Sequence, residues 1–146
     1  MAVYKKIFVN YDILKILPLN EEECLLFCNS GNLGMVKLFS LSTGDVTNKY
    51  VFTEGSFNGV AGIDGSQYLL LSGNEIWYFS YSYKGFTQWA TALNPRCLVY
   101  DHTEGCYYYA ENQFLLKKNR LMPNENLNTY TFQDTIINIL PVYNRD

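Results

Sequence analysis

Histidine is nearly absent from this chain: His102 is the only one among 146 residues. Catalytic Ser-His-Asp and Cys-His arrangements use a histidine as the base, so any such site would need His102. That residue lies in 101–105 (Asp-His-Thr-Glu-Gly), which is typical of a hairpin turn at the surface. The carboxylates Glu21-Glu22-Glu23 form an adjacent run, whereas acid–base catalysis needs two opposed carboxyl groups. We therefore predict no catalytic residues, and that the protein is not an enzyme.

The chain also has no excess of positive charge. Its 11 Lys and Arg residues face 14 Asp and Glu, for a net charge of −3 and a pI near 5.1. Binding to nucleic acid normally needs a basic face, so we predict no nucleic-acid partner. The sequence shows no signal-peptide pattern and no apolar run near the roughly 20 residues that span a bilayer. We accordingly expect no association with a membrane.

Metal and phosphate motifs are missing as well. The four cysteines contain no CxxC pair, and 31–34 (Gly-Asn-Leu-Gly) lacks the lysine and helix start of a phosphate loop. Cys24 and Cys28 would lie about 13 Å apart on a strand, too far for a disulfide. All four cysteines lie in apolar segments. We predict buried free thiols, a reducing, cytoplasmic location, and no metal or cofactor.

What the chain does contain is aromatic residues, at 16%, and an internal repeat. Leu14-Lys15-Ile16-Leu17-Pro18-Leu19 recurs as Ile137-Asn138-Ile139-Leu140-Pro141-Val142, at an offset of 137 − 14 = 123 residues, three times 41. Residues 36–44 (Val-Lys-Leu-Phe-Ser-Leu-Ser-Thr-Gly) align with 76–85 at an offset of 40. Such periods are typical of stacked repeat units, each of which here would have four strands.

Turn signals separate the strands of each unit. The strands are predicted at 13–18, 24–28, 35–41, 46–52; 58–63, 67–72, 75–81, 86–92; and 96–100, 106–110, 113–118, 127–132. The second and third strands are continuously apolar, which indicates burial on both faces, whereas the fourth alternates and would be half-exposed. This pattern predicts an all-β fold, a partial β-propeller-like array of four-stranded antiparallel blades. One alternative is a helix starting at Asn20, because 20–23 (Asn-Glu-Glu-Glu) also resembles a capping box.

The segment 36–44 resembles the end of a WD-repeat blade. Phe39 stands where that family has a Trp, Ser40 where it has an Asp, and Thr43-Gly44 forms its closing turn. No Gly-His dipeptide accompanies it, so with His102 as the only histidine the family's Asp–His network cannot recur in each unit. The resemblance implies a propeller fold and binding of partner proteins.

The predicted organisation is a single β-repeat domain, 1–146, which leaves the array open. Its units are approximately 13–53, 57–93 and 95–133, with partial blades at 1–12 and 134–146, built around strands near 3–9 and 135–142. Open ends would expose apolar strands such as the one around Ile136 and Ile137, and unpaired edges invite pairing. We therefore predict a protein partner or a second copy that completes the array of blades.

Two functions remain open from the sequence. The first is a non-enzymatic scaffold or structural subunit of a protein assembly. The second is a ligand- or glycan-binding β module of the adhesin type, in which aromatic side chains stack on sugars. Candidate interface residues, besides Ile136 and Ile137, are aromatic residues near the rim loops, since Tyr and Trp are common anchors: Tyr81, Tyr83, Phe86 and Trp89.

Overall fold

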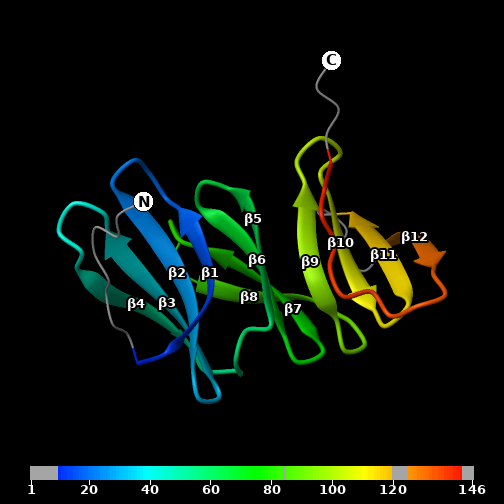
Figure 1. The fold of residues 1–146 in the computed structure, drawn as a ribbon, viewed down its shortest axis with the longest axis horizontal. Helices are drawn as coiled ribbons and strands as arrows, with labels where there is room; N and C mark the ends of the chain where they lie inside the picture. The colour runs from blue at the N-terminus through cyan, green and yellow to red at the C-terminus, as the bar shows by residue number, and fades with distance from the viewer. Residues whose placement is uncertain (1–9, 84, 120–124, 143–146) are drawn as a thin grey trace, which may run out of the picture. The chain divides into compact units, whose positions relative to one another are not determined.

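The computed structural model describes residues 10–83, 85–119 and 125–142, and all the regular structure in these ranges is β (Figure 1). Twelve strands form three four-stranded antiparallel sheets, and in each sheet the strands follow the order of the chain. The all-β prediction is confirmed. Within the described ranges, no helix is long and apolar enough to cross a membrane.

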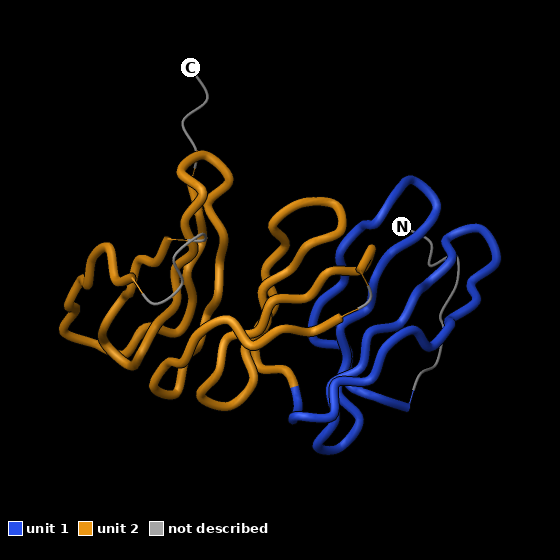
Figure 2. The backbone as a smooth tube through the Cα atoms, turned by 180° about the vertical axis from the view of Figure 1, so that it is seen from behind, with its two compact units in different colours: residues 1–56 blue, residues 57–146 orange. Residues whose placement is uncertain are grey.

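The chain divides into two compact units, residues 1–56 and 57–146, coloured separately in Figure 2. The first unit contains one sheet and the second contains two. The boundary falls between the predicted units 13–53 and 57–93, and the assignment of 1–146 to one domain stays a prediction.

The first unit is a meander of four strands joined by tight turns. The β2–β3 hairpin turns at Gly31, whose φ of 61° lies in the left-handed region that glycine adopts without a steric penalty. Alternating hydrogen-bonded pairs run from Glu23 opposite Ser40 to Ser30 opposite Leu33. The strands are β1 (Asp12–Pro18), β2 (Glu23–Ser30), β3 (Leu33–Ser40) and β4 (Val46–Phe52).

The second unit repeats this meander twice. Its first sheet has the strands β5 (Gly59–Asp64), β6 (Gln67–Ser72), β7 (Glu75–Ser80) and β8 (Gly85–Thr91). Its second sheet has the strands β9 (Arg96–Asp101), β10 (Cys106–Glu111), β11 (Phe114–Asn119) and β12 (Asn126–Thr131).

The core of the second unit lies between its two sheets. Leu69 and Leu71 of β6 share one buried cluster with Leu98 of β9 and with Tyr107 and Tyr109 of β10. Strand β9 contacts both β5 and β6, so the first strand of one sheet lies against the face of the preceding sheet. Neighbouring blades of a propeller pack in this way, with the first strand of one blade against the face of the blade before it.

The strands of each sheet differ in how deeply they are buried, and the second strands follow the prediction. The second strands are buried on both faces, as Leu25, Leu26 and Phe27 of β2 show. The fourth strands β4 and β8 are partly exposed, as expected, and each has one buried residue, Phe52 and Ala90. In β12 every residue is exposed, which is more than the expected half-exposure. The third strands are less buried than expected, because β11 is mostly half-exposed.

Two expectations about the strands need correction. The segment 135–142 was expected to be a strand, but it runs as coil in the structure, because no described strand lies beside it to accept a ladder of hydrogen bonds. The helix starting at Asn20 is wrong: Glu22 N donates to the Asn20 Oδ1 atom (2.9 Å) in a tight turn, and β2 follows. The expected strand near 3–9 lies outside the described residues.

All four cysteines are free thiols, as predicted. Cys28 and Cys106 are buried, whereas Cys24 and Cys97 are only half-buried, so the expectation of four buried thiols holds for two of them. Burial raises the pKa of Cys28 from 9.0 to about 11, although Lys37 nearby lowers it in part. The Cys28 thiol is therefore neutral and unreactive at ordinary pH.

Candidate functional site

The aromatic residues predicted as a binding rim do not point the same way. Phe86 stacks on Phe79 with ring centroids 4.7 Å apart and lies 6.4 Å from Phe57, so it packs within the unit. Trp89 packs against the core cluster and lies 5.4 Å from the Tyr78 ring. Phe86 and Trp89 therefore pack against other side chains of the second unit.

The remaining two aromatic residues of that group lie at the turn between β7 and β8. Tyr83 is 87% exposed, and its amide donates to the Ser80 Oγ atom (3.3 Å). Tyr81 is half-buried, with its amide bonded to the Ser66 carbonyl (2.8 Å). Of the four residues, only Tyr83 presents its ring to solvent, and an interface role for the group stays a prediction.

The other predicted site lies at the C-terminal end of the second unit, where the third sheet has two distinct faces. Alternation along β10 sends Tyr107 and Tyr109 into the core, where their rings stack at 6.2 Å. Burial raises the pKa of both phenols, that of Tyr109 to about 12. This face is therefore closed by the second sheet.

The opposite face of the third sheet carries Val99, Tyr108 and Leu115: Val99 of β9 lies opposite Tyr108 of β10, and Leu115 of β11 lies opposite Ala110, two residues further along β10. The C-terminal segment runs back over this face: Ile139 and Val142 line the same open cavity, of about 380 Å³, as these three side chains (Figure 1, red). We call this cavity the tail groove. Its lining is Val99, Tyr100, Asp101, Thr103, Glu104, Tyr108, Leu115 and residues 139–142.

Polar groups lie at one end of the tail groove. The Lys117 Nζ atom is 2.5 Å from the Glu104 Oε2 atom and 5.9 Å from the centre of the Tyr108 ring. The hydrogen bond with Glu104 raises the pKa of Lys117, and burial raises the pKa of Tyr108. Asp101 accepts the Thr103 amide (2.9 Å), as expected of a turn. Because Lys117 already pairs with Glu104, this end of the groove is held in place by internal contacts.

The segment that forms the other wall is bonded to residues of the third sheet, within the described ranges, only where it begins. The Ile136 amide donates to the Asn112 carbonyl (2.9 Å) in the β10–β11 turn. Beyond it, the Ile139 amide donates to the side chain of its neighbour Asn138 (2.9 Å), a local bond rather than a ladder bond. Ile137, Leu140 and Val142 are 90%, 76% and 90% exposed. The segment thus offers apolar side chains and a free backbone edge.

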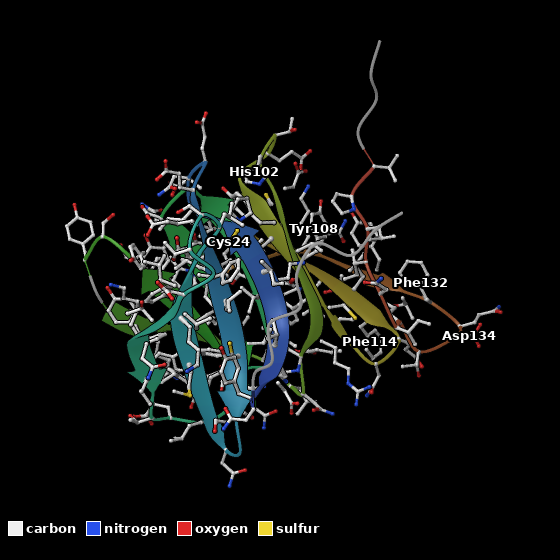
Figure 3. The ribbon with its side chains drawn as sticks, turned by 60° about the vertical axis from the view of Figure 1, so that its left-hand side comes forward. Cys24, His102, Tyr108, Phe114, Phe132 and Asp134 are labelled. Carbon is white, nitrogen blue, oxygen red and sulfur yellow. The ribbon has the colours of Figure 1, made fainter. Side chains whose placement is uncertain are left out.

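Figure 3 draws the side chains as sticks and labels three aromatic residues of this region: Tyr108, Phe114 and Phe132. The Phe132 amide donates to the Gln113 carbonyl (3.0 Å), which places Phe132 beside the start of β11. Phe114 and Phe132 are both exposed. Phe114 and Phe132 therefore add to the exposed apolar surface at the C-terminal end of this unit.

The first unit contains one polar cluster away from this site. Lys37 is buried, bonds the Asn48 side chain, and lies 4.3 Å from the centre of the Tyr11 ring. Burial and the nearby Cys28 raise the pKa of Tyr11, whose hydroxyl is buried without a hydrogen-bond partner among the described residues. A raised pKa in both the thiol and the phenol favours their neutral forms, which argues against an activated nucleophile.

The remaining polar residues of interest from the sequence do not assemble into a site. His102 is exposed in the β9–β10 turn, 5.0 Å from the Tyr100 ring in an edge-on contact. Glu21 and Glu22 are exposed in the β1–β2 turn. Among residues 10–83, 85–119 and 125–142, no group of three or more His, Cys, Asp or Glu side chains is placed to hold a metal ion.

Comparisons with known proteins support the fold. No family model and no curated protein matches the chain. Among solved structures, the crystal structure of a nidogen/laminin complex matches 82% of this chain and 46% of that chain, at 17% identity and a TM-score of 0.59. An auxiliary nutrient binding protein from Bacteroides thetaiotaomicron matches 85% of this chain and 31% of its own, at 12% identity and a TM-score of 0.64. The structure of the Dos1 propeller matches 87% of this chain and 37% of its own, at 12% identity and a TM-score of 0.61.

These matches define the class of protein by its fold. The chain is a propeller-like array of four-stranded antiparallel blades, and it spans less than half the length of each of these structures. At 12–17% identity, what these structures share with the chain is the fold. The specific WD-repeat signature finds no support among them.

Sequence reasoning identified the C-terminal apolar segment, through Ile136 and Ile137, but not the groove on which it lies. The sheet wall of that groove comes from Val99, Tyr108 and Leu115, which are spread over three strands. A continuously apolar strand such as 106–110 predicts burial on both faces without saying what covers each face. The repeat offset of 123 was the signal that could have found it, because it assigns 137–142 the place of a first strand.

Proposed function

We propose that this chain is a non-enzymatic protein-interaction module, a structural subunit whose blades are completed by a protein partner. The observation that carries the proposal is the segment 136–142, which lies along the tail groove of the third sheet with none of the described strands paired to it. Contiguous exposed apolar surface on a soluble domain commonly marks an interface. We further propose a reducing, cytoplasmic location, which the four free thiols support.

The glycan-binding alternative has less support. A sugar site of stacked aromatic rings needs several exposed rings on one rim, and of the four candidates only Tyr83 is largely exposed. Phe86 and Trp89 instead contact other side chains of their own sheet. The nutrient binding protein among the structural matches shares the fold, at 12% identity, and says nothing of a sugar site in this chain.

The native mass of the particle tests the proposal. The tagged chain would be purified from its source under mild conditions and measured by light scattering, beside the chain purified alone. We expect a stoichiometric protein partner and a mass well above 16.9 kDa. A monomer from the source that binds members of a glycan array would contradict the proposal and favour the alternative.

A further inference from the structure

One asparagine of the chain is followed directly by a glycine, and it lies at the start of the second sheet. Asn58 is exposed at a bend, and β5 begins with Gly59. Of the asparagines in the sequence, Asn58 alone has a glycine after it. Its main-chain amide donates to the Leu71 carbonyl (2.8 Å), so the backbone is held here while the residue stays exposed to solvent.

Packing explains why a glycine stands at this position. A Cβ atom on Gly59 would lie 2.9 Å from the Leu71 Cδ1 atom and 3.1 Å from its Cγ atom. Leu71 is fully buried in the core of the second unit, so its side chain has little room to move aside. A larger residue at 59 would therefore crowd the core. The Asn-Gly pair is a consequence of how β5 packs on β6.

An exposed asparagine before a glycine is open to attack by its own main chain. The Gly59 nitrogen attacks the Asn58 Cγ atom, a C–N bond forms, and the bond from Cγ to Nδ2 breaks. Ammonia leaves with the proton of the Gly59 nitrogen, and a cyclic succinimide remains. Glycine favours this step because it has no Cβ to obstruct the approach and the freest backbone. Among the described residues, the Asn58 side-chain amide has no hydrogen bond that would hold it away.

Water then opens the ring in one of two ways. Addition at the former side-chain carbonyl gives aspartate with an ordinary main chain. Addition at the main-chain carbonyl gives isoaspartate, in which the backbone runs through the Cβ and Cγ atoms and is longer by a methylene group. Together the steps consume a water molecule, release ammonia and leave a carboxylate. They involve no change of oxidation state, so no oxidant or reductant is needed.

We propose that Asn58 is a site of spontaneous modification, and that its isoaspartate product loosens the start of β5. Ala61 and Ile63 of this strand belong to the core cluster shared with β9 and β10 (Figure 1). An added methylene displaces the residues that follow it relative to β6, where Gly59 lies opposite Leu71. The ladder then either absorbs the extra atom as a bulge or loses its first pairs.

The Asp64-Gly65 pair at the other end of β5 provides a contrast within the same strand. The Asp64 Oδ1 atom accepts the amides of Ser66 (3.0 Å) and Gln67 (3.1 Å), so this carboxylate is held in a turn. A carboxylate is also a poorer electrophile than an amide. Asp64 should therefore stay unchanged under conditions that convert Asn58.

Peptide mapping by mass spectrometry, after incubation of the full chain at pH 8 and 37 °C, tests the site. We expect Asn58 to change from amide to acid about tenfold faster than the exposed Asn32 and Asn138, which precede larger residues. A protein isoaspartate methyltransferase with labelled S-adenosylmethionine then detects isoaspartate in the peptide that contains residue 58. Conversion of Asn58 no faster than that of Asn32 and Asn138, or an aspartate product alone, would overturn the proposal.

Two variants separate the lengthened backbone from the new charge. Asn58→Gln has an amide that cyclises slowly, and after the same incubation it should keep the hydrogen exchange of fresh protein at 60–63. Fresh Asn58→Asp carries the charge on an ordinary backbone, and it should also exchange as the fresh wild type does. Thermal unfolding checks that both variants fold.

Only the incubated wild-type chain should exchange faster at 60–63, in proportion to its isoaspartate content. Unchanged exchange in a chain that contains isoaspartate would overturn the loosening of β5. Equally fast exchange in fresh Asn58→Asp would assign the effect to charge and overturn it as well. The experiment needs no partner protein, so its outcome is independent of the proposed interaction function.

Discussion

Residues 13–19 and 136–142 have nearly the same sequence but different structures. Both read Ile-x-x-Ile-Leu-Pro followed by Leu or Val, yet the first is strand β1 and the second is coil. The local sequence is equally suited to a strand in both. The difference is the neighbour: β1 has β2 beside it, whereas the C-terminal segment has no described strand beside it.

The side chains of strand β1 are themselves mostly exposed. Ile16 is 56% exposed, and the register with β2 shifts between Ile13 and Lys15, leaving Leu14 bulged. Its order therefore depends on main-chain pairing with β2, whose four central residues, 25–28, are buried. A strand of this type is an edge whose conformation its partner determines.

Removing the buried partner of β1 should have the largest effect. Phe27 of β2 is fully buried and lies opposite Lys15 of β1. Phe27→Ala should lower the free energy of unfolding of the first unit by about 3–5 kcal/mol, since it deletes a large buried side chain and leaves a cavity. Urea unfolding measures this loss of free energy, and hydrogen exchange at the amides of 12–18 shows whether β1 stays paired. Thr47→Ala, on the exposed strand β4, is the control and should change stability by less than about 0.5 kcal/mol.

Equivalent leucines in the two segments should differ in their effects. Leu17 is half-buried in β1, so Leu17→Ala should cost about 1–2 kcal/mol, less than a fully buried leucine. Leu140, at the same place in the repeat, is mostly exposed, and Leu140→Ala should cost less than about 0.5 kcal/mol in the isolated chain. Urea midpoints of the two variants compare them. Equal losses would mean that the C-terminal segment is packed as firmly as β1.

The thiol of Cys28 reports whether β1 is in place, because Cys28 lies opposite Ile13 in the ladder. Burial holds its pKa near 11 in the folded chain, against 9.0 ordinarily. Its contribution to stability is therefore complete below about pH 9 and is lost as the pH rises toward 11, where only the unfolded thiol ionises readily.

The wild-type chain should accordingly lose more stability between pH 8 and pH 10.5 than Cys28→Ala, in urea unfolding at the two values. At pH 8.5, Cys28 should react with iodoacetamide more slowly than the half-buried Cys24. Rapid alkylation of Cys28 in the native chain would show that β1 is not docked.

Exchanging the two sequences should have the smallest effect. Giving β1 the C-terminal sequence needs three changes, Leu14→Ile, Lys15→Asn and Leu19→Val, none of which removes a fully buried side chain. The triple variant should unfold within about 0.5 kcal/mol of wild type and keep β1 paired, as hydrogen exchange at 12–18 would show. A large loss would mean that the side chains, rather than the neighbouring strand, determine the difference.

The same comparison explains how far the sequence predicted the fold. The strands in residues 12–131 lay within about two residues of prediction, because turns and apolar runs are local signals. The coil at 136–142 was missed, since pairing depends on a strand that the described chain does not provide. The sequence also did not predict which of the four aromatic residues would be exposed. Phe86 packs on Phe79 and Trp89 packs on Tyr78, and these contacts depend on the register between strands.

The most direct test of the account is amide hydrogen exchange on the isolated chain at low micromolar concentration, resolved to single residues in the two matching segments. The account predicts slowed exchange at the amides of 12–17 that bond to β2, and slowed exchange of Ile136, whose amide bonds Asn112. It predicts exchange near the unstructured rate at Ile137 and Leu140. Protection of Ile137 and Leu140 equal to that of β1, in a chain shown to be monomeric, would contradict it.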